Sequence, residues 1–302
     1  MLTAIHFFLT DFFYQQIQSK EEALVSGIRK GCPRPENLQV SFAALSHLPF
    51  FSGCKPAEAL LITDSSLALH QLQKQGYYTI ALYHSQNRSE DFSSTPYAVE
   101  DLFFLTYDSY EKAYQRLAGL PWEILRTPRL LLRESTLEDI DAFYEIYREP
   151  SITRYMENLF PEREAEYVYL KDYINKIYGF YGFGLWTVVD RSSGKMIGRA
   201  GLSVREGYEL PELGFVTDVH FQHQGYTFEI CDAILTYARE ELLFPEIQAF
   251  VHPQNTSSIR LLERLGFCPA ETVLLNKTPH IRYLYRTGST ARQETLEVPV
   301  DL

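Results

Sequence analysis

A short glycine-containing segment between a strand-like run and a helix is the feature that most constrains this chain. It reads Gln222-His223-Gln224-Gly225-Tyr226-Thr227. A flexible glycine that opens directly into a helix aims several unpaired backbone N–H groups at one point, and the positive end of the helix dipole adds to their field. Such a joint suits phosphate oxygens, although plain strand–turn–helix joints in α/β folds also contain glycine.

The residues around this segment predict its flanking elements. Glu212 to Val219 reads as a strand, and the helix that follows has one apolar face. That face recurs at spacings of three and four and consists of Phe228, Cys231, Leu235, Ala238 and Leu242. We interpret Cys231 as a buried free thiol on this face.

A second strand, turn and helix follow in the sequence. Ile247 to Val251 is a short apolar strand, and His252 to Asn255 forms a turn. A helix from Ser257 to Leu265 then ends at Gly266, which occupies the position expected of a C-terminal cap.

Five short motifs occur in a fixed order around these elements. They are Thr127 to Arg133 (Thr-Pro-Arg-Leu-Leu-Leu-Arg), Ile197 to Leu202 (Ile-Gly-Arg-Ala-Gly-Leu), Glu212 to Phe215 (Glu-Leu-Gly-Phe), Asn255 to Ser258 (Asn-Thr-Ser-Ser) and Leu265 to Phe267 (Leu-Gly-Phe). With the Gly225 loop, they resemble the GCN5-related N-acetyltransferase (GNAT) superfamily, in its ribosomal-protein-alanine N-acetyltransferase-like branch. The resemblance implies a GNAT fold, a mixed and mostly antiparallel sheet flanked by helices, over residues 121–290.

The resemblance also implies a reaction and a cofactor site. An acetyl group would pass from acetyl-CoA to a primary amine, either a protein N-terminal α-amine or a small-molecule amine, by direct attack in a ternary complex. Main-chain donors of the loop would hold the pyrophosphate. The strand edge before the loop would pair with the pantetheine amides, where a bulge leaves N–H groups free to polarise the thioester carbonyl. The implied cofactor-binding residues are Phe215, Val216, Thr217, Gln222, His223, Gln224, Gly225, Tyr226, Thr227, Asn255 and Ser258.

Two positions depart from the family pattern. Thr227 stands where Gly or Ala lets the backbone approach phosphate, so its hydroxyl donates to phosphate or its bulk loosens the site. Leu262 stands where many relatives carry a Tyr general acid. Protonation of the leaving thiolate then falls to Ser258, to Tyr283 or to solvent.

Glu212 is the candidate general base, since it matches the family Glu on the strand that borders the cofactor; the alternative is a surface or structural carboxylate. An α-amine with a pKa near 8 is already about a tenth neutral at pH 7. A lysine amine, with a pKa of about 10.4, would cost about 4.6 kcal/mol to deprotonate there. A sparsely equipped site therefore favours α-amines or small amines of low pKa. The candidate catalytic residues are Glu212, Ser258 and Tyr283.

Two further groups of residues invite a functional interpretation. Tyr181 and Phe183 belong to a glycine–aromatic segment that borders the acceptor pocket in the resembling family, so we expect them to line the substrate site; core packing is the alternative. His220 and His223 flank the loop without a metal-ligand companion at useful spacing, so we expect exposed loop histidines and no metal site.

Length and charge limit the remaining possibilities. A chain of 302 residues exceeds what one such domain needs, so a second unit is expected. The formal net charge of −11 argues against nucleic acid as the main partner. The aromatic run Ala4 to Phe13 carries Asp11, lacks a basic n-region and is too short to span a bilayer, which favours a cytoplasmic protein without a membrane anchor. The oligomeric state is open, and a homodimer is one candidate.

Residues 1–120 predict a separate α/β unit. A strand at Ala59 to Thr63, a helix ending at Gly76 and a strand at Tyr78 to Tyr83 form a βαβ unit, which implies a parallel sheet, and Tyr107 to Leu117 is again helical. Cys54-Lys-Pro56 and Asp64 resemble the later half of haloacid-dehalogenase-like (HAD-like) phosphatases.

The first strand of this unit supplies at most the second acid of the phosphatase Asp-x-Asp pair, at Asp11. Without the nucleophile no aspartyl-phosphate forms. The favoured interpretation is a degenerate, Rossmann-like accessory unit; residual phosphatase chemistry and an unrelated α/β unit are the alternatives. Residues 291–302 are then a C-terminal tail. For the whole chain, the alternative to an enzyme is a catalytically weak acyl-CoA or metabolite sensor with a GNAT fold.

Overall fold

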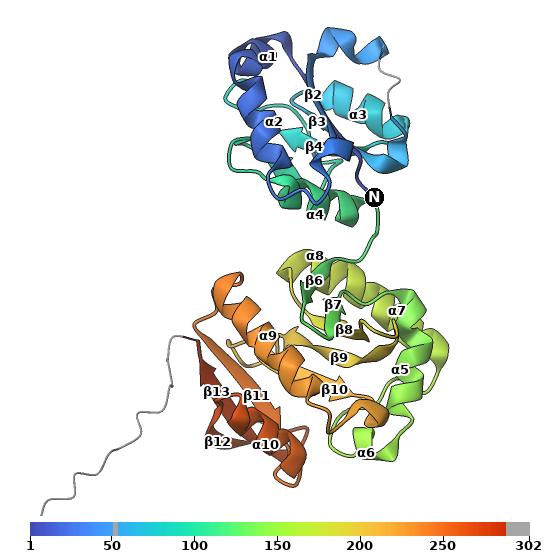
Figure 1. Cartoon of the computed structure of the whole chain (residues 1–302), viewed down its shortest axis with the longest axis vertical. Coiled ribbons are helices and arrows are strands. Elements are labelled where there is room, and N and C mark those ends of the chain that lie inside the picture. The colour runs from blue at the N-terminus through green and yellow to red at the C-terminus, as the bar shows by residue number, and fades with distance from the viewer. Residues whose placement is uncertain (51–53, 288–302) are drawn as a thin grey trace, which may run out of the picture. The chain divides into compact units, whose positions relative to one another are not determined.

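The computed structural model describes residues 1–50 and 54–287 (Figure 1). Its contacts divide the chain into two units, Met1–Trp122 and Glu123–Leu302. The tail predicted over residues 291–302 lies outside the described residues. Each unit is described by itself below.

The described part of the first unit is built on a parallel sheet in the order β2-β1-β3-β4-β5. Its strands are β1 (Ala4–Leu9), β2 (Gln39–Ala44), β3 (Ala59–Thr63), β4 (Tyr78–Leu82) and β5 (Ala98–Val99). Its α-helices are α1 (Asp11–Ile17), α2 (Glu21–Arg29), α3 (Ser66–Lys74) and α4 (Tyr107–Leu117).

The predicted βαβ unit and its parallel pairing are confirmed. All five residues of β3 are buried, as expected for a strand covered on both faces. The Ser65 side chain accepts from the Ala68 N–H and caps α3, and Gly76 follows the helix with a φ of +86°. The predicted helix Tyr107 to Leu117 is confirmed as α4.

The second unit carries a sheet in the order β12-β13-β11-β10-β9-β8-β7-β6. Its strands are β6 (Glu123–Arg126), β7 (Leu130–Arg133), β8 (Leu185–Asp190), β9 (Met196–Ser203), β10 (Glu212–Thr217), β11 (Glu246–Val251), β12 (Cys268–Leu275) and β13 (Thr278–Arg286). Its α-helices are α5 (Ile140–Tyr147), α6 (Pro150–Thr153), α7 (Arg163–Tyr173), α8 (Gly179–Tyr181), α9 (Tyr226–Glu240) and α10 (Thr256–Arg264).

The pairing of this second sheet is antiparallel except where β10 meets β11 in parallel. The predicted mixed, mostly antiparallel sheet is therefore confirmed. Helices cover both of its faces. Ala200 of β9 belongs to the core that includes Ile230 and Ile234 of α9, whereas the neighbouring Arg199 lies over the Phe143 ring of α5. Since successive side chains of a strand point to opposite faces, α9 and α5 lie on opposite sides of the sheet (Figure 1).

The helices next to the predicted loop begin and end at the expected signals. Gly225 precedes α9 with a φ of +80°, the left-handed conformation that favours glycine. The Asn255 side chain accepts from the Ser258 N–H and caps α10. Gly266 ends that helix with a φ of +92°, and its N–H donates to Glu263 O. Cys231 is a buried free thiol on α9, as predicted, and burial raises its pKa. No helix within the described ranges is long and apolar enough to cross a bilayer.

Candidate active site

Strands β10 and β11 pair only at the beginning of β10 and then diverge. Their only registered pair is Glu212 with Gln248, whereas β10 pairs with β9 along its whole length, from Glu212 to Thr217. A cavity of about 1310 Å³ adjoins the separated strands. Its lining includes Leu213 to Thr217 of β10 and Ala249 to Val251 of β11. The part of the β10 edge that no longer pairs with β11 is thus open to a ligand.

The glycine loop lies at one end of this cavity. Gln222, His223, Gly225 and Thr227 belong to the lining, together with Asn255 and Ser258 from the start of α10. The first backbone bond of α9 runs from Glu229 N to Gly225 O, at 3.0 Å. The amide groups of the preceding residues are those that a helix start leaves without intrahelical partners. Two helix starts and an open strand edge therefore surround one space.

Gln224 and Tyr226, also expected to bind cofactor, are not part of the cavity lining. The Gln224 carbonyl accepts from Arg129, and the Tyr226 ring lies 4.2 Å from the Arg129 guanidinium carbon. His223 is exposed and has a positive φ of 59°. His220 is exposed as well, as predicted.

Residues of the Thr-Pro-Arg motif, just before β7, make hydrogen bonds to the glycine loop and to the first turn of α9. Thr127 Oγ1 donates to Glu229 Oε1 at 2.6 Å, and Arg129 Nε donates to Glu229 Oε2 at 2.6 Å. Arg129 Nη1 also donates to the Gln224 carbonyl at 2.9 Å. Burial raises the pKa of Glu229, but the hydrogen bonds from Thr127 and Arg129 outweigh it, so the pKa lies below its ordinary value. The sequence marked Thr127 and Arg129 only as part of a family motif.

Thr227 is tied to the end of β10. Its Oγ1 lies 2.8 Å from Thr217 Oγ1, a hydrogen bond between the first turn of α9 and the strand edge. From the sequence we expected Thr227, in place of Gly or Ala, either to donate to phosphate or to loosen the site. Neither expectation includes the hydrogen bond to Thr217. The hydroxyl instead joins the two elements that enclose the loop end of the cavity.

Glu212 lies in the cavity lining as an ion pair. The residue is 8 % exposed, and both of its carboxylate oxygens accept from Arg205, at 2.5 and 3.0 Å. The hydrogen bond with Glu212 raises the pKa of Arg205. Each carboxylate oxygen keeps a second lone pair. A proton transfer at Glu212 would therefore take place next to a guanidinium, a partner that sequence reasoning missed.

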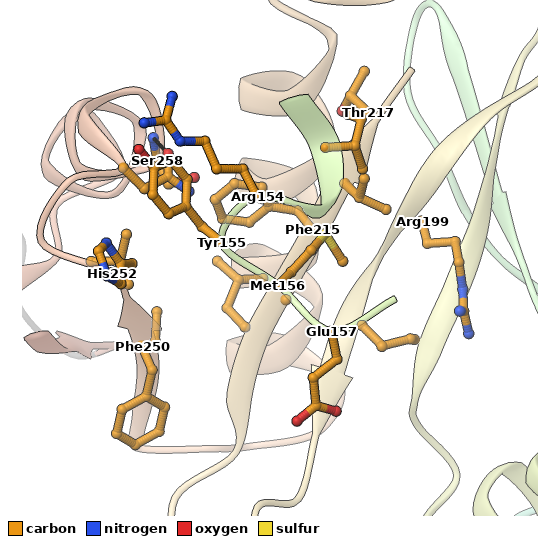
Figure 2. A pocket seen from close by; sticks show the side chains of 18 of the residues that line it. Arg154, Tyr155, Met156, Glu157, Arg199, Phe215, Thr217, Phe250, His252 and Ser258 are labelled. Atoms are coloured by element: carbon orange, nitrogen blue, oxygen red, sulfur yellow. Dashed lines mark hydrogen bonds between the residues drawn. The ribbon is translucent and has the colours of Figure 1, made fainter. Parts of the chain in front are cut away.

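The two candidate acids are placed very differently. Ser258 lines the cavity, and within the described residues its hydroxyl makes no hydrogen bond (Figure 2). Tyr283 is 3 % exposed in β13, lies outside the cavity lining, and donates to Glu263 Oε1 at 3.4 Å. Burial raises the pKa of Tyr283. The structure therefore makes Tyr283 a core residue, contrary to the expectation of an acid near the sulfur.

The expected substrate residues also lie away from the cavity. Phe183 is buried and meets the Phe244 ring edge-on at 5.3 Å, and Tyr181 packs on Phe183 at 5.6 Å. Neither lines the cavity: Phe183 belongs to the core that includes Ile230 of α9, whereas Tyr181 on α8 is 40 % exposed. For Phe183 the alternative of core packing is what the structure shows.

The far end of the cavity is lined by a segment that no sequence signal had indicated. Residues 154–161 connect α6 to α7 and contribute Tyr155, Met156 and Glu157 to the lining (Figure 2). Tyr155 stacks on His252 at 4.9 Å, and Asn276 Nδ2 donates to Glu157 Oε1 at 2.9 Å. The segment thus contacts the residue that follows β11 and the β12–β13 turn. It has neither a helical nor a strand period, so pattern reasoning could not place it.

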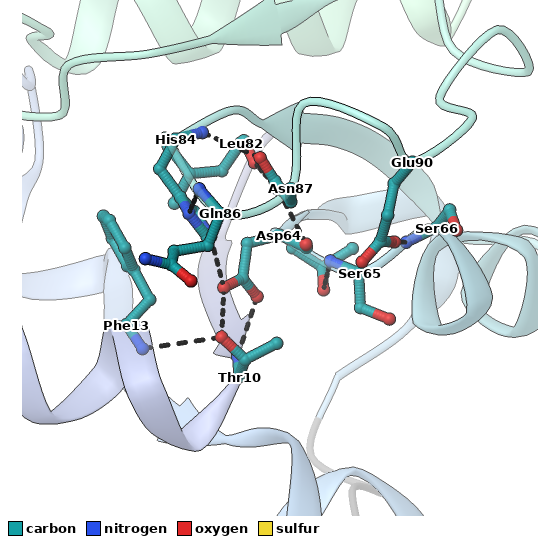
Figure 3. A network of polar contacts seen from close by, with 11 residues as sticks. Thr10, Phe13, Asp64, Ser65, Ser66, Leu82, His84, Gln86, Asn87 and Glu90 are labelled. Carbon is teal, nitrogen blue, oxygen red and sulfur yellow. Dashed lines mark hydrogen bonds and ion pairs between the residues drawn. The ribbon is translucent and has the colours of Figure 1, made fainter.

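Asp64 of the first unit is fully buried in a hydrogen-bonded network (Figure 3). Its carboxylate accepts from Thr10 N at 2.7 Å, from Thr10 Oγ1 at 2.5 Å and from His84 Nε2 at 3.1 Å. Asn87 Nδ2 bridges the Asp64 and Leu82 carbonyls, both at 2.8 Å. The network joins the ends of β1, β3 and β4, so the residue resembling a phosphatase acid serves packing here. No cluster of three or more potential metal ligands occurs in the described part of the chain.

A family model and several known proteins are similar to part of this chain. The family described as Acetyltransferase (GNAT) domain matches residues 129–268. The uncharacterized N-acetyltransferase YnaD of Bacillus subtilis (strain 168) is 30% identical over 143 residues, which cover 47% of this chain and 81% of the relative. The uncharacterized N-acetyltransferase p20 of Bacillus licheniformis is 28% identical over 149 residues, with 48% and 82% covered. The solved acetyltransferase of Agrobacterium tumefaciens str. C58 superposes with a TM-score of 0.46 and 25% identity, covering 54% of this chain and 93% of that one.

The fold, the open strand edge and these relatives define the chain as an acetyltransferase. It belongs to the GNAT acetyltransferase domain family, with the matched region inside the second unit.

Proposed function

We propose that the second unit transfers the acetyl group of acetyl-CoA to a primary amine by direct attack in a ternary complex. The observation that carries the proposal is the divergence of β10 from β11 next to the glycine-opened start of α9, with both features lining one cavity. Acetyl-CoA supplies the activated acetyl thioester, and the protein supplies binding, orientation and proton transfer.

The cofactor roles follow from the available donors. Backbone N–H groups from Gln222 to Thr227 suit a pyrophosphate, since Gly225 and the start of α9 present donors without side-chain bulk. The β10 edge from Phe215 to Thr217 suits the pantetheine amides, because β11 does not pair with it there. A backbone N–H of the same edge would polarise the thioester carbonyl. The caps of α10 place Asn255 and Ser258 beside this space.

Proton transfer requires a base for the amine and an acid for the thiolate. Glu212 is the proposed base, directly or through a water, and Ser258 the proposed acid; both line the cavity. Arg205 donates to both carboxylate oxygens of Glu212, so each oxygen has one lone pair left for a proton from the amine. We propose an acceptor with a readily deprotonated amine, an α-amine or a small amine of low pKa, rather than a lysine side chain.

Two measurements on the full chain test this function. Calorimetry with acetyl-CoA measures binding, and thiol release over a panel of α-amines, polyamines and lysine peptides measures turnover. We expect binding, and turnover that favours α-amines. Binding without turnover on any amine would instead support a sensor of acyl-CoA, and absence of binding would refute both functions.

For the first unit we propose a degenerate, HAD-like accessory role without catalysis. The support is that Asp64 is fully buried and accepts three hydrogen bonds from Thr10 and His84, which leave about one carboxylate lone pair for a phosphate-bound cation. Assays with p-nitrophenyl phosphate and Mg²⁺ test this proposal; hydrolysis that disappears in Asp64→Asn would contradict it.

A further inference from the structure

Arg199 is a buried guanidinium in the lining of the acetyl-transfer cavity. The residue is 7 % exposed, lies on β9, and stands in register with Val216 of β10. Val216 belongs to the strand edge proposed for pantetheine. In Figure 2, Arg199 and His252 lie on opposite sides of the view, with Phe215 and Met156 between them. A charged side chain thus borders the ligand space one strand away from the cofactor edge.

This charge lacks a carboxylate partner within the described residues. Of the other arginines in the lining, Arg205 pairs with Glu212, whereas Arg154 and Arg264 are exposed to solvent and lie over the Tyr155 and Phe228 rings, so that Arg199 is the buried one without a carboxylate. For Arg199 no carboxylate oxygen lies within 4.0 Å, and its buried Nε has no hydrogen-bond acceptor. The Phe143 ring lies 4.5 Å from the guanidinium carbon in a cation–π contact, and the Tyr147 hydroxyl is a hydrogen-bond partner; neither carries a full negative charge. Burying a guanidinium in this way is costly unless an anion completes the site.

The neighbouring carboxylate does not complete it. Glu166 of α7 is 2 % exposed and lines the same end of the cavity, but its Oε2 accepts from Phe160 N at 3.1 Å and it forms no ion pair with Arg199. Tyr147 and Tyr169 line this end as well. The surroundings of Arg199 are therefore aromatic and hydroxylic. Tyr147 engages part of the guanidinium, which has five N–H donors, so donors are left for a ligand.

We propose that Arg199 binds the carboxylate of the acceptor, so that the acceptor is a small amine bearing a carboxylate, such as an α-amino acid. This inference rests on the proposed acetyl transfer. The planar fork of a guanidinium matches a carboxylate with two parallel hydrogen bonds. Because Arg199 is buried, only a small anionic group at the end of the cavity reaches it. The amine of the same molecule is then held near the β10 edge.

The test compares amines that differ only in the anionic group. L-Phenylalanine and L-leucine are assayed against their amides, with acetyl-CoA and the full chain, and the phosphonic analogue of each amino acid separates carboxylate from phosphonate recognition. The amide has the lower amine pKa, so reactivity alone favours the amide. We expect the acids to be preferred in kcat/KM by roughly 10- to 100-fold, the range of hydrogen bonds to a charged group.

Variants assign the preference to Arg199. In Arg199→Gln the acid-to-amide ratio in kcat/KM falls to about one through a higher KM for the acid; Arg199→Lys restores part of the preference. Arg163→Gln is the matched control, since it removes an exposed arginine that pairs with Asp141. It leaves the ratio unchanged. A preference that survives in Arg199→Gln, or one for phosphonates over carboxylates, overturns the inference.

A measurement on the wild type covers the case in which Arg199→Gln does not fold. Acetate and formate should inhibit competitively against the amine but not against acetyl-CoA. Absence of that inhibition overturns the carboxylate site. If the wild type turns over amides and acids at equal rates, only the proposed role of Arg199 is refuted. If the wild type binds no acetyl-CoA, the proposed function itself is refuted.

Discussion

Arg129 and Glu229 form an ion pair of 2.6 Å across 100 residues of sequence. Arg129 lies just before β7, and Glu229 lies in the first turn of α9. The pair therefore joins the start of strand β7 to the helix that begins at the glycine loop. The same guanidinium donates to the Gln224 carbonyl inside the loop. A motif at residue 129 therefore sets the shape of a loop near residue 224.

Replacing Arg129 by Met should weaken acetyl-CoA binding more than it weakens the fold. The Arg129 side chain is 42% exposed, so the loss is about 1 kcal/mol, a roughly 3- to 10-fold higher Kd by calorimetry. Arg126→Met is the control, because it breaks the exposed pair with Glu123 on the neighbouring β6. Equal Kd values for both variants would contradict the role of Arg129 in holding the loop.

The same pair should make stability depend on pH. The pKa of folded Glu229 is below its unfolded value, so its contribution to stability is complete above the unfolded pKa of about 4.3 and is lost as the pH falls through the lowered folded pKa. The Tm difference between the wild type and Glu229→Gln should be constant near neutral pH and shrink in acid. A difference that grows in acid would contradict the sign.

Gly225→Val should abolish acetyl-CoA binding with a modest loss of stability. A Cβ at Gly225 meets Arg129 Nη2 at 3.5 Å, an ordinary contact, so the problem is the φ of +80°. A branched residue there costs about 1–3 kcal/mol or shifts the loop. Gly194→Val, at a φ of +70° in the β8–β9 turn, carries similar strain away from the cavity. Calorimetry should show binding in the Gly194 variant only; normal binding by both would disprove the loop assignment.

Glu212→Gln should lower kcat by about 10²-fold or more and remove a limb of the pH–rate profile if Glu212 takes up the amine proton. Arg205→Met removes the same ion pair but keeps the carboxylate. Comparison of the two therefore separates catalysis from structural pairing. An unchanged profile in Glu212→Gln, or equal losses in both variants, would exclude Glu212 as the base.

Asp64→Asn should destabilise the first unit by about 2–4 kcal/mol, because the buried carboxylate accepts three hydrogen bonds, one of them from His84. Acetyl-CoA affinity should not change, since every residue lining the cavity belongs to the second unit. Asp11→Asn, at an exposed position of α1, is the control for thermal denaturation. An Asp64 variant as stable as the control would show that the network does not hold the strands together.

Much of the fold could be predicted because its signals are local. Gly225, Gly266 and Gly76 mark helix ends through positive φ values that other residues rarely adopt. The apolar face of α9 and the buried run of β3 follow from periodicity and from unbroken hydrophobicity. Element boundaries moved by one or two residues; β10, for example, ends at Thr217 rather than Val219.

The site was predictable only in part. Gly225, Asn255, Ser258 and Glu212 line one cavity, as the family motifs implied. Tyr283 and Phe183 do not line it. The sequence around a tyrosine or phenylalanine in an apolar segment is the same whether the ring contacts a ligand or the core. Arg205 and the segment 154–161 carried no signal at all.

The sequence alone determined the strand–loop–helix order, the caps and the family motifs, because each depends on residues a few positions apart. Tertiary structure decided which charges meet. Glu229 pairs with Arg129, Glu212 pairs with Arg205, and Asp64 bonds to Thr10 and His84, whereas Arg199 has no carboxylate partner among the described residues. The physical reason is that charge pairing and burial depend on distances of a few ångströms between segments that the chain itself holds far apart.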